Sequence, residues 1–222
     1  MKTIKGSLVL LLMLSVGITN AQDSTGIQKE NEPIFEKAEK EAVFPGGLAE
    51  WRKYLEKNLK ATTPIDNGAP VGLYTVIVRF IVNKDGNISD IQPMTKLGYG
   101  MEEEVVRIIQ KSGAWSPAMM KGKPVKAYRK QPVTFVVMTD EYDISTATQY
   151  VLYKGIDNEL KVDAGKVKPE DLQLTISSGS IIAGPNNTFI ARVNKTGRVT
   201  VTLFNTKKEK EIGTVSFEVR ER

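Results

Sequence analysis

Two kinds of residue cluster could serve as a functional site: a calcium-binding loop and a pair of catalytic carboxylates. The candidate for a calcium loop is "NKDGN". Asn83, Asp85 and Asn87 stand at alternate positions there, which is how a calcium loop presents its oxygen ligands. An EF-hand loop needs glycine at its sixth position and a bidentate acid at its twelfth, whereas here Gly86 is fourth and Met94 is twelfth. Because Asp-Gly strongly favours a hairpin turn, we interpret the stretch as a turn and predict no metal site.

Carboxylates are the other candidates, because the chain has no His and no Cys and so lacks the commonest general base and a thiol nucleophile. Pairs of carboxylates do hydrolyse glycosides. The acids that cluster are Glu102 to Glu104 and the pair Asp140-Glu141, and neither group stands in a pocket-forming context. The first group fits the negative first turn of a helix. We therefore predict no catalytic residue, no enzyme activity and no cofactor.

The N-terminus has the pattern of a secretory signal peptide over residues 1–21. Lys2 and Lys5 precede the apolar stretch "LVLLLMLSVGI", which is short for a membrane span. Thr19 and Ala21 are small residues at the positions that signal peptidase favours. We expect cleavage after Ala21, export, and no stable membrane span afterwards. The formal net charge of +5 includes the two signal lysines, so the exported chain is too weakly basic to predict nucleic-acid binding.

The first helix is predicted after a polar leader, residues 22–40. Apolar residues at helical spacing predict a helix over residues 47–60, with one buried face made of Leu48, Trp51, Leu55 and Leu59. The "FPGG" corner stands directly before it. We expect Phe44 to act as an apolar clamp and the glycines to set the angle at which the chain enters the helix.

Alternating stretches then predict strands. "LYTVIVRFIV" places Val76, Val78 and Phe80 on one face, and because its other face is also partly apolar we expect this strand to be central. "ISDIQPM" predicts a second strand, "MEEEVVRIIQKSGAW" a second helix and "VKAYRKQPVTFVV" a third strand. This order predicts a small α+β domain with two helices on a three-stranded antiparallel sheet.

Pro132 lies inside the third predicted strand. Proline has no N–H to give to a ladder, so it confines the strand to an edge or marks a bulge. An exposed edge needs protection or binds a strand of another protein. The alternative is an edge that the second domain or a second copy covers. We predict partner binding at Val125, Lys126, Ala127, Tyr128, Arg129, Lys130 and Gln131, and expect proline at Ala127 or Arg129 to weaken it without harming the fold.

From Tyr150 to the C-terminus the chain has no helical periodicity. Short alternating stretches, among them "LQLTI", "TFIARV", "RVTVTLF" and "TVSFEV", are separated by polar turns that contain glycine. This spacing predicts a small, all-β, Ig-like sandwich over residues 150–222, after a linker over residues 139–149.

Three stretches of the first domain carry a family resemblance: "FPGG", "VIVRFIVNKDGNISD" and, most specifically, "GAWSPAMMKGKPVKAYRKQPVTFVV". With them, residues 41–138 resemble the C-terminal domain of TonB-type energy transducers of Gram-negative bacteria. In that family the domain grips an extended segment of an outer-membrane transporter by adding it to the sheet edge. The resemblance therefore implies a periplasmic location and a protein partner in the envelope.

The second domain carries another resemblance, through "YVLYKGIDNELKV", "FIARVNKTGRVTVTLF" and "IGTVSFEVRER". It resembles a periplasmic β-domain of the gliding-motility and secretion protein GldM. The resemblance implies a structural or interaction module of the periplasm.

Taken together, the residues and the resemblances predict a non-enzymatic periplasmic adaptor that pairs with an extended partner segment and is linked to outer-membrane transport or secretion. One alternative is a membrane-anchored TonB-type energy transducer whose signal stays uncut. Another is a self-assembling structural component of the envelope, which predicts a homo-oligomer. The predicted segments are residues 1–21, 22–40, 41–138, 139–149 and 150–222.

Overall fold

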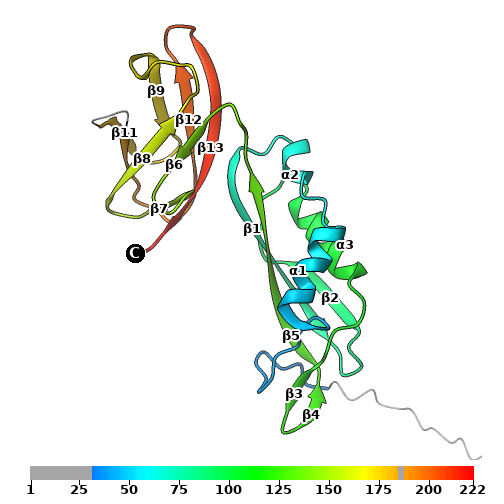
Figure 1. Cartoon of the computed structure of the whole chain (residues 1–222). Coiled ribbons are helices and arrows are strands. Elements are labelled where there is room, and N and C mark those ends of the chain that lie inside the picture. Colours follow the sequence, from blue (N-terminus) through cyan, green and yellow to red (C-terminus); the bar gives the residue numbers. More distant parts are fainter. Residues whose placement is uncertain (1–31, 185–187) are drawn as a thin grey trace, which may run out of the picture. The chain divides into compact units, whose positions relative to one another are not determined.

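The computed structural model describes residues 32–184 and 188–222. The predicted signal peptide and residues 22–31 of the predicted leader lie outside this part of the chain. Within it, no helix is long and apolar enough to cross a membrane. The described residues build two hydrophobic cores, one mainly in an N-terminal region (residues 33–138) and one mainly in a C-terminal region (residues 139–222) (Figure 1).

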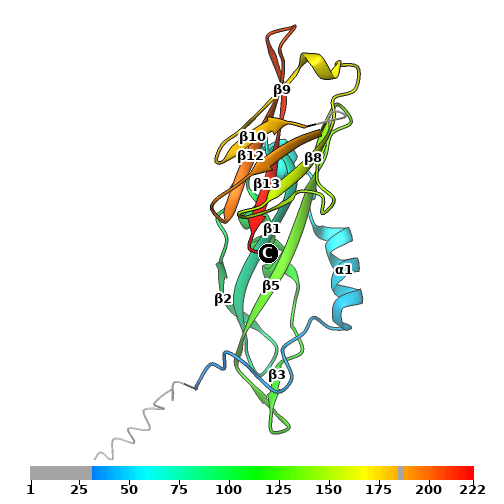
Figure 2. The same ribbon diagram turned by 90° about the vertical axis from the view of Figure 1, so that its left-hand side faces the viewer.

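The N-terminal region follows the predicted order of helices and strands, with one short helix and one hairpin added. Its elements are α1 Gly47–Asn58, α2 Thr63–Asp66, β1 Val71–Val82, β2 Ile88–Pro93, α3 Met101–Lys111, β3 Ala118–Met120, β4 Lys123–Val125 and β5 Ala127–Val137. β1 is central, as predicted, and pairs antiparallel with β2 on one side and β5 on the other. Figure 2 shows α1 alongside β5, on the side away from β2.

One face of β1 carries the N-terminal core. Its buried side chains alternate along the strand, as predicted, and are Tyr74, Val76, Val78, Phe80 and Val82. Trp115 packs edge-on against Phe80, with ring centres 5.0 Å apart. Gly86 of the "NKDGN" turn lies so close to Trp115 that a Cβ there would collide with the Trp115 carbonyl oxygen. The turn joins the antiparallel strands β1 and β2, with the Gly86 N–H donating to the Asn83 carbonyl at 2.9 Å, so the predicted hairpin turn is confirmed and is packed on the core.

The "FPGG" corner leads the chain into α1 through aromatic packing. The Phe44 ring centre lies 5.3 Å from that of Trp51 and 5.7 Å from that of Trp115. Gly46 and Gly47 have positive φ angles of 79° and 74°, which residues with a Cβ rarely adopt. The corner therefore has the structural role that the sequence predicts.

The apolar stripe of α1 is not one buried face, and the prediction is wrong here. Trp51 is 3% exposed, but Leu48 is 64% exposed, and Leu55 and Leu59 are only partly buried. The physical reason is the position of the helix. Because α1 runs along the edge strand β5, these three leucines line a groove beside that strand instead of covering the sheet.

The C-terminal region encloses its core between two sheets, in agreement with the predicted sandwich; its Ig-like topology stays a prediction. One sheet contains β9, β12 and β13, and the other has the order β10, β11, β8, β6. Phe217 and Leu203 of the first sheet and Leu160 of the second are buried in this core. The bounds are β6 Asp143–Ser145, β7 Val151–Tyr153, β8 Asp157–Asp163, a 3₁₀ turn Pro169–Asp171, β9 Leu172–Ile176, β10 Ser180–Ala183, β11 Thr188–Arg192, β12 Gly197–Asn205 and β13 Lys210–Arg220.

The sheet of the N-terminal region is not a separate three-stranded sheet, which corrects the prediction. Gly72 of β1 pairs in parallel with Ser216 of β13, so that both strands belong to one seven-stranded sheet. A Cβ on Gly72 would meet the Ser216 carbonyl oxygen at 2.6 Å, so the close approach requires glycine. Arg198 adds hydrogen bonds of 3.1 Å to the Leu73 carbonyl and 3.0 Å to the Ser216 hydroxyl. No alternation in the sequence marks this contact.

Candidate functional site

The candidate site is the outer edge of β5, an 11-residue strand whose only paired neighbour strand among the described residues is β1. The register between the two strands is unbroken, so backbone groups of successive β5 residues point alternately toward β1 and away from it. The N–H of Tyr128 points away, because it donates to the Phe35 carbonyl at 3.0 Å. It follows that Lys130, Pro132, Thr134 and Val136 also turn their backbone outward.

Pro132 fits this arrangement. The residue opposite it, Ile77, directs its own N–H and carbonyl to Thr95 and Met94 on the far side of β1. Pro132 therefore lies at a position where the missing N–H would have faced the open edge, as expected for proline in an edge strand. The prediction that this strand forms an edge is confirmed.

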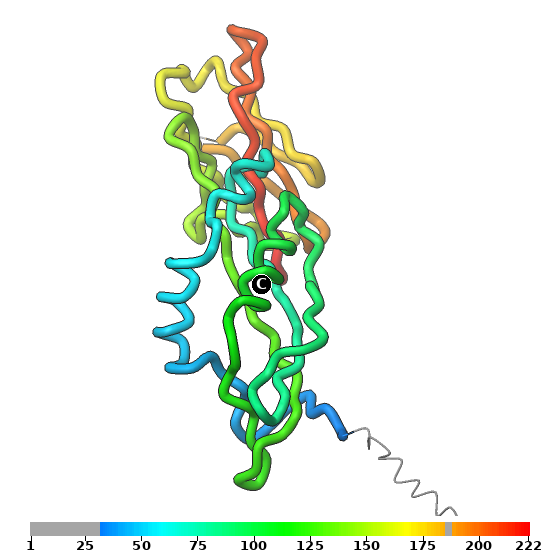
Figure 3. Tube along the Cα trace, turned by 90° about the vertical axis from the view of Figure 1, so that its right-hand side faces the viewer, coloured from blue at the N-terminus to red at the C-terminus, as the bar shows by residue number. Residues whose placement is uncertain are grey.

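A segment of the same chain covers one end of this edge. Phe35 donates its N–H to the Lys126 carbonyl at 2.9 Å and accepts from Tyr128. Further along, Lys40 pairs with Met119 and Val43 with Ser116. We call residues 35–43 the N-terminal strap; Figure 3 shows it in blue against the green strands. The sequence predicts a polar leader for most of these residues, because pairing through backbone groups leaves no pattern in side-chain types.

The predicted binding residues are therefore divided by the structure. Val125 ends β4, and the backbone of Lys126 and Tyr128 is bonded to the strap. Ala127, Arg129 and Gln131 turn their backbone toward β1. We therefore predict that proline at Ala127 or Arg129 breaks the ladder, in place of the expectation that such variants keep their fold. The outward backbone groups of Lys130 have no partner among the described residues.

The open part of the edge continues beyond the predicted residues. No partner is recorded within residues 32–184 and 188–222 for the outward N–H groups of Lys130, Thr134 and Val136. The Pro132 carbonyl accepts from the Gln131 side chain at 3.2 Å. We call residues 130–136 the open edge. It offers a row of backbone donors and acceptors to another strand.

A groove of about 670 Å³ runs beside the open edge. Gln131 to Thr134 of β5 line one wall. Leu48 and Leu55 of α1 and Leu59 just after it line the other, together with the charged Arg52 and Glu56. The exposed leucines that the helix leaves unburied therefore face the same space as the free backbone groups. A strand that entered the groove would find backbone hydrogen-bonding groups on one side and mainly apolar side chains on the other.

Glu104 anchors the chain at the end of α1 and so holds one wall of the groove in place. Its carboxylate accepts from the Lys60 N–H at 2.7 Å and from Nε and Nη2 of Arg107, both at 2.6 Å. Burial raises the pKa of the carboxyl, but these hydrogen bonds outweigh burial and leave the pKa below its usual value. Arg107 also donates to the Asn58 carbonyl at the last residue of the helix.

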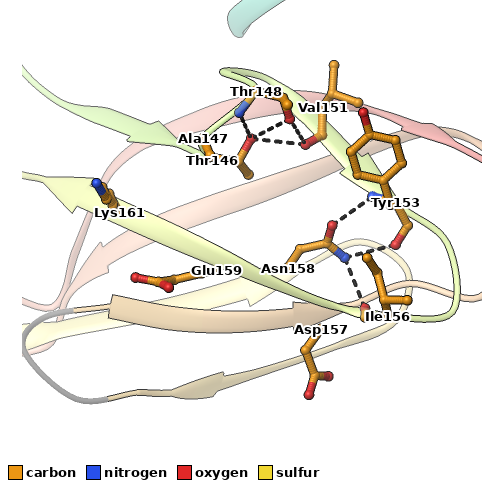
Figure 4. A pocket seen from close by; sticks show the side chains of 10 residues that line it. All are labelled: Thr146, Ala147, Thr148, Val151, Tyr153, Ile156, Asp157, Asn158, Glu159 and Lys161. Carbon is orange, nitrogen blue, oxygen red and sulfur yellow. Dashed lines mark hydrogen bonds between the residues drawn. The ribbon is translucent and has the colours of Figure 1, made fainter. Parts of the chain in front are cut away.

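A second hollow, of about 390 Å³, lies in the C-terminal region beside the turn "GIDN". Figure 4 shows that its polar groups bond to one another. The Asn158 side chain accepts from the Tyr153 N–H at 2.7 Å and donates to the carbonyls of Tyr153 and Ile156. The Thr146 hydroxyl donates to the Gln149 carbonyl at 2.7 Å. These contacts hold the turn in shape, so the hollow is a weaker candidate than the open edge.

Two family models match the chain. Residues 75–137 match the model of the Gram-negative bacterial TonB protein C-terminal domain, and residues 141–220 match the model of the GldM third domain. Both resemblances that the sequence suggested are confirmed, in the same order along the chain. No curated protein matches the chain. The first match covers residues 75–82 of β1 and the whole of β5, and therefore the open edge.

The matches indicate an envelope protein of periplasmic type, linked to transport or to gliding and secretion, built from interaction modules of non-catalytic families. The "FPGG" corner, the strap and α1 lie before the first match. The groove thus combines one wall that the TonB model covers with another wall that it does not.

Proposed function

We propose that this protein is a non-enzymatic periplasmic adaptor whose open edge pairs with an extended segment of a partner protein in the cell envelope. The observation that carries the proposal is the row of outward N–H groups at Lys130, Thr134 and Val136 beside an apolar groove. In strand addition, main-chain hydrogen bonds give affinity and neighbouring apolar contacts give selectivity. The open edge provides for both.

The partner is expected among outer-membrane transporters or secretion components. The two family matches support this class, because one module is of TonB type and the other comes from a gliding and secretion protein. The C-terminal region would then connect the bound segment to a further component of the envelope. An exported, signal-cleaved form of the chain belongs to this proposal.

A proline variant tests the pairing itself. Lys130→Pro removes an N–H that faces the open edge, so it leaves the ladder with β1 intact. Lys130→Ala removes the same side chain but keeps the N–H, and it is the matched control. We expect Lys130→Pro to lose the partners that co-purify with the wild-type chain from solubilised envelopes, while Lys130→Ala retains part of them. Equal recovery with both folded variants would contradict strand addition.

Self-assembly is a second candidate, because the open edge of one copy could pair with that of another. This mechanism predicts a concentration-dependent dimer in sedimentation that Lys130→Pro abolishes. A monomer at all concentrations would leave the adaptor function as the better account.

A further inference from the structure

The charges along β5 and the β3–β4 hairpin that precedes it are of one sign, and the acid Glu56 of the groove belongs to α1. The stretch from Ala118 to Thr139 contains no Asp or Glu. Its charged residues are Lys121, Lys123, Lys126, Arg129 and Lys130. None of them forms an ion pair with another residue in the part of the chain that the structure describes.

Two of the cations stand directly opposite each other. Arg79 of β1 is the register partner of Lys130, and both side chains lie on the face of the sheet away from the N-terminal core. Like charges at directly opposed positions of an antiparallel pair are destabilising. The Arg79 guanidinium lies 4.5 Å from the Tyr128 ring centre and donates to Gln92 at 3.2 Å, but its Nε is buried without a partner. This row across the sheet, Gln92, Arg79 and Lys130, ends at the open edge.

We propose that the segment captured at the open edge carries an acidic side chain at the position beside Lys130. A strand added to β5 extends the cross-strand row by one residue, and an Asp or Glu there would relieve the repulsion between Arg79 and Lys130. The proposal rests on the strand pairing of the proposed function and adds the chemistry of the partner. The preferred segment is extended and places acidic residues on one face and apolar residues toward the leucines of α1.

The strap does not supply this acid. Within the described residues, none of its three acids, Glu36, Glu39 and Glu41, forms an ion pair with Lys130. Glu39 instead accepts from the backbone N–H of Lys121 at 2.8 Å, at the tip of the β3–β4 hairpin. The strap's backbone hydrogen bond furthest along β5 is with Tyr128, two residues before Lys130 on the same face of the sheet. The position beside Lys130 is therefore left for another chain.

An opposing structural role exists for the same residues. Lys and Pro on an edge strand prevent it from pairing with other chains, and Lys130 and Pro132 could serve that purpose alone. In that case, exchanging Lys130 for an acid would change self-association without changing any preference among peptides. The test must therefore distinguish an edge that Lys130 protects from pairing from an edge at which Lys130 selects acidic segments.

The test compares three nine-residue peptides with valine at alternate positions and Glu, Gln or Lys at the others, by fluorescence anisotropy with the full exported chain. We expect the Glu peptide to bind about tenfold tighter than the Lys peptide at low salt, from two or three opposite-charge contacts, and the Gln peptide to lie between. Lys130→Glu should narrow or reverse this order. Lys57→Glu changes the net charge equally on the exposed side of α1 and should leave the order unchanged.

The outcomes separate the two proposals. If the three peptides bind equally and Lys130→Pro abolishes binding of all three, strand addition stands and the acidic preference is wrong. If Lys130→Glu and Lys57→Glu weaken Glu-peptide binding to the same extent, the preference comes from net charge and not from this row, which also overturns the inference. If Lys130→Pro changes nothing, the proposed function itself fails.

Discussion

The edge strands of the two regions differ in length. In the C-terminal region the edge strands are short, with three residues in β6, four in β10 and five in β9. In the N-terminal region the edge strand β5 has 11 residues, and the strap covers only its N-terminal end, at Lys126 and Tyr128. Short edge strands are one way in which proteins avoid pairing with foreign chains. The short edges of the C-terminal region therefore offer little backbone to a foreign strand, and the long edge of β5 is where we propose that strand addition takes place.

The two regions also differ in how the charged side chains on these surfaces are paired. In the C-terminal region Arg192 lies 2.7 Å from Asp157 and Arg220 lies 2.8 Å from Glu218. At the open edge Lys130 faces Arg79 with no acid between them. Surface ion pairs contribute little to stability, so this contrast matters mainly for what each surface attracts. It supports the proposal that partner binding takes place at the open edge of the N-terminal region.

The largest expected effect comes from proline on the wrong side of β5. Arg129→Pro removes an N–H that faces β1 and leaves a carbonyl of β1 unsatisfied, so we expect a loss of about 3 kcal/mol in the free energy of unfolding. Lys130→Pro should cost less than about 1 kcal/mol, because its N–H faces the open edge. Urea unfolding of both variants measures the difference. Equal losses would show that the backbone orientation assigned to β5 is wrong.

Glu104 tests whether the groove depends on the anchor at the end of α1. Glu104→Gln should cost about 2 kcal/mol at neutral pH, because it weakens bonds to Arg107 and Lys60, whereas the exposed neighbour Glu103→Gln should cost almost nothing. The pKa of Glu104 is lowered in the folded chain, so its stabilisation is complete above the unfolded pKa of about 4.3 and is lost as the pH falls through the folded value. Unfolding curves at several acidic pH values should therefore converge for wild type and Glu104→Gln.

Tyr150 gives the corresponding test for the closed region. Burial, and then a hydrogen bond to Asp143 at 2.9 Å, raises its pKa to about 12. A raised pKa means that the contribution of Tyr150 is complete below the unfolded value of about 10 and is lost as the pH rises toward the folded value. Tyr150→Phe should cost about 1 kcal/mol at neutral pH. Tyrosinate absorbance should show one fewer late-titrating group in this variant; an unchanged titration curve would contradict the assignment.

Leu48 gives the smallest effect on stability and the clearest separation of stability from binding. Because its side chain is 64% exposed, Leu48→Gln should change the free energy of unfolding by less than about 0.5 kcal/mol. It should still weaken partner binding, since it removes an apolar side chain from the groove. Trp51→Gln is the contrast, because Trp51 is buried and its loss should unfold the core. Binding to Leu48→Gln at the wild-type level would remove α1 from the site.

Much of the fold follows from local patterns in the sequence. Alternation along β1, the apolar spacing of α3 and the turn at Gly86 are properties of adjacent residues, and each predicted its element. Pro132 predicted an edge because its missing N–H is a chemical fact that holds in any fold.

The rest depends on contacts that the side-chain pattern does not encode. The strap pairs through backbone groups, so Phe35 in a polar stretch gave no signal of its position. The side to which each β5 N–H points depends on register with β1, which is why the sequence placed the proline tests at Ala127 and Arg129 when they belong at Lys130. The sequence predicts that the leucines of α1 are buried in the core, because their spacing shows that one face of the helix is apolar. Spacing does not show whether that face packs on a sheet or lines an open groove.

The most direct test of strand capture is site-specific photo-crosslinking in cells, with the probe at Thr134 on the open edge and a control probe at Lys57 on the exposed side of α1. The account predicts a crosslink from Thr134 to one extended segment of an envelope protein, absent from the Lys57 probe and lost when Lys130→Pro is added. A Thr134 crosslink that persists with Lys130→Pro, or one that reaches only another copy of the same chain, would contradict it.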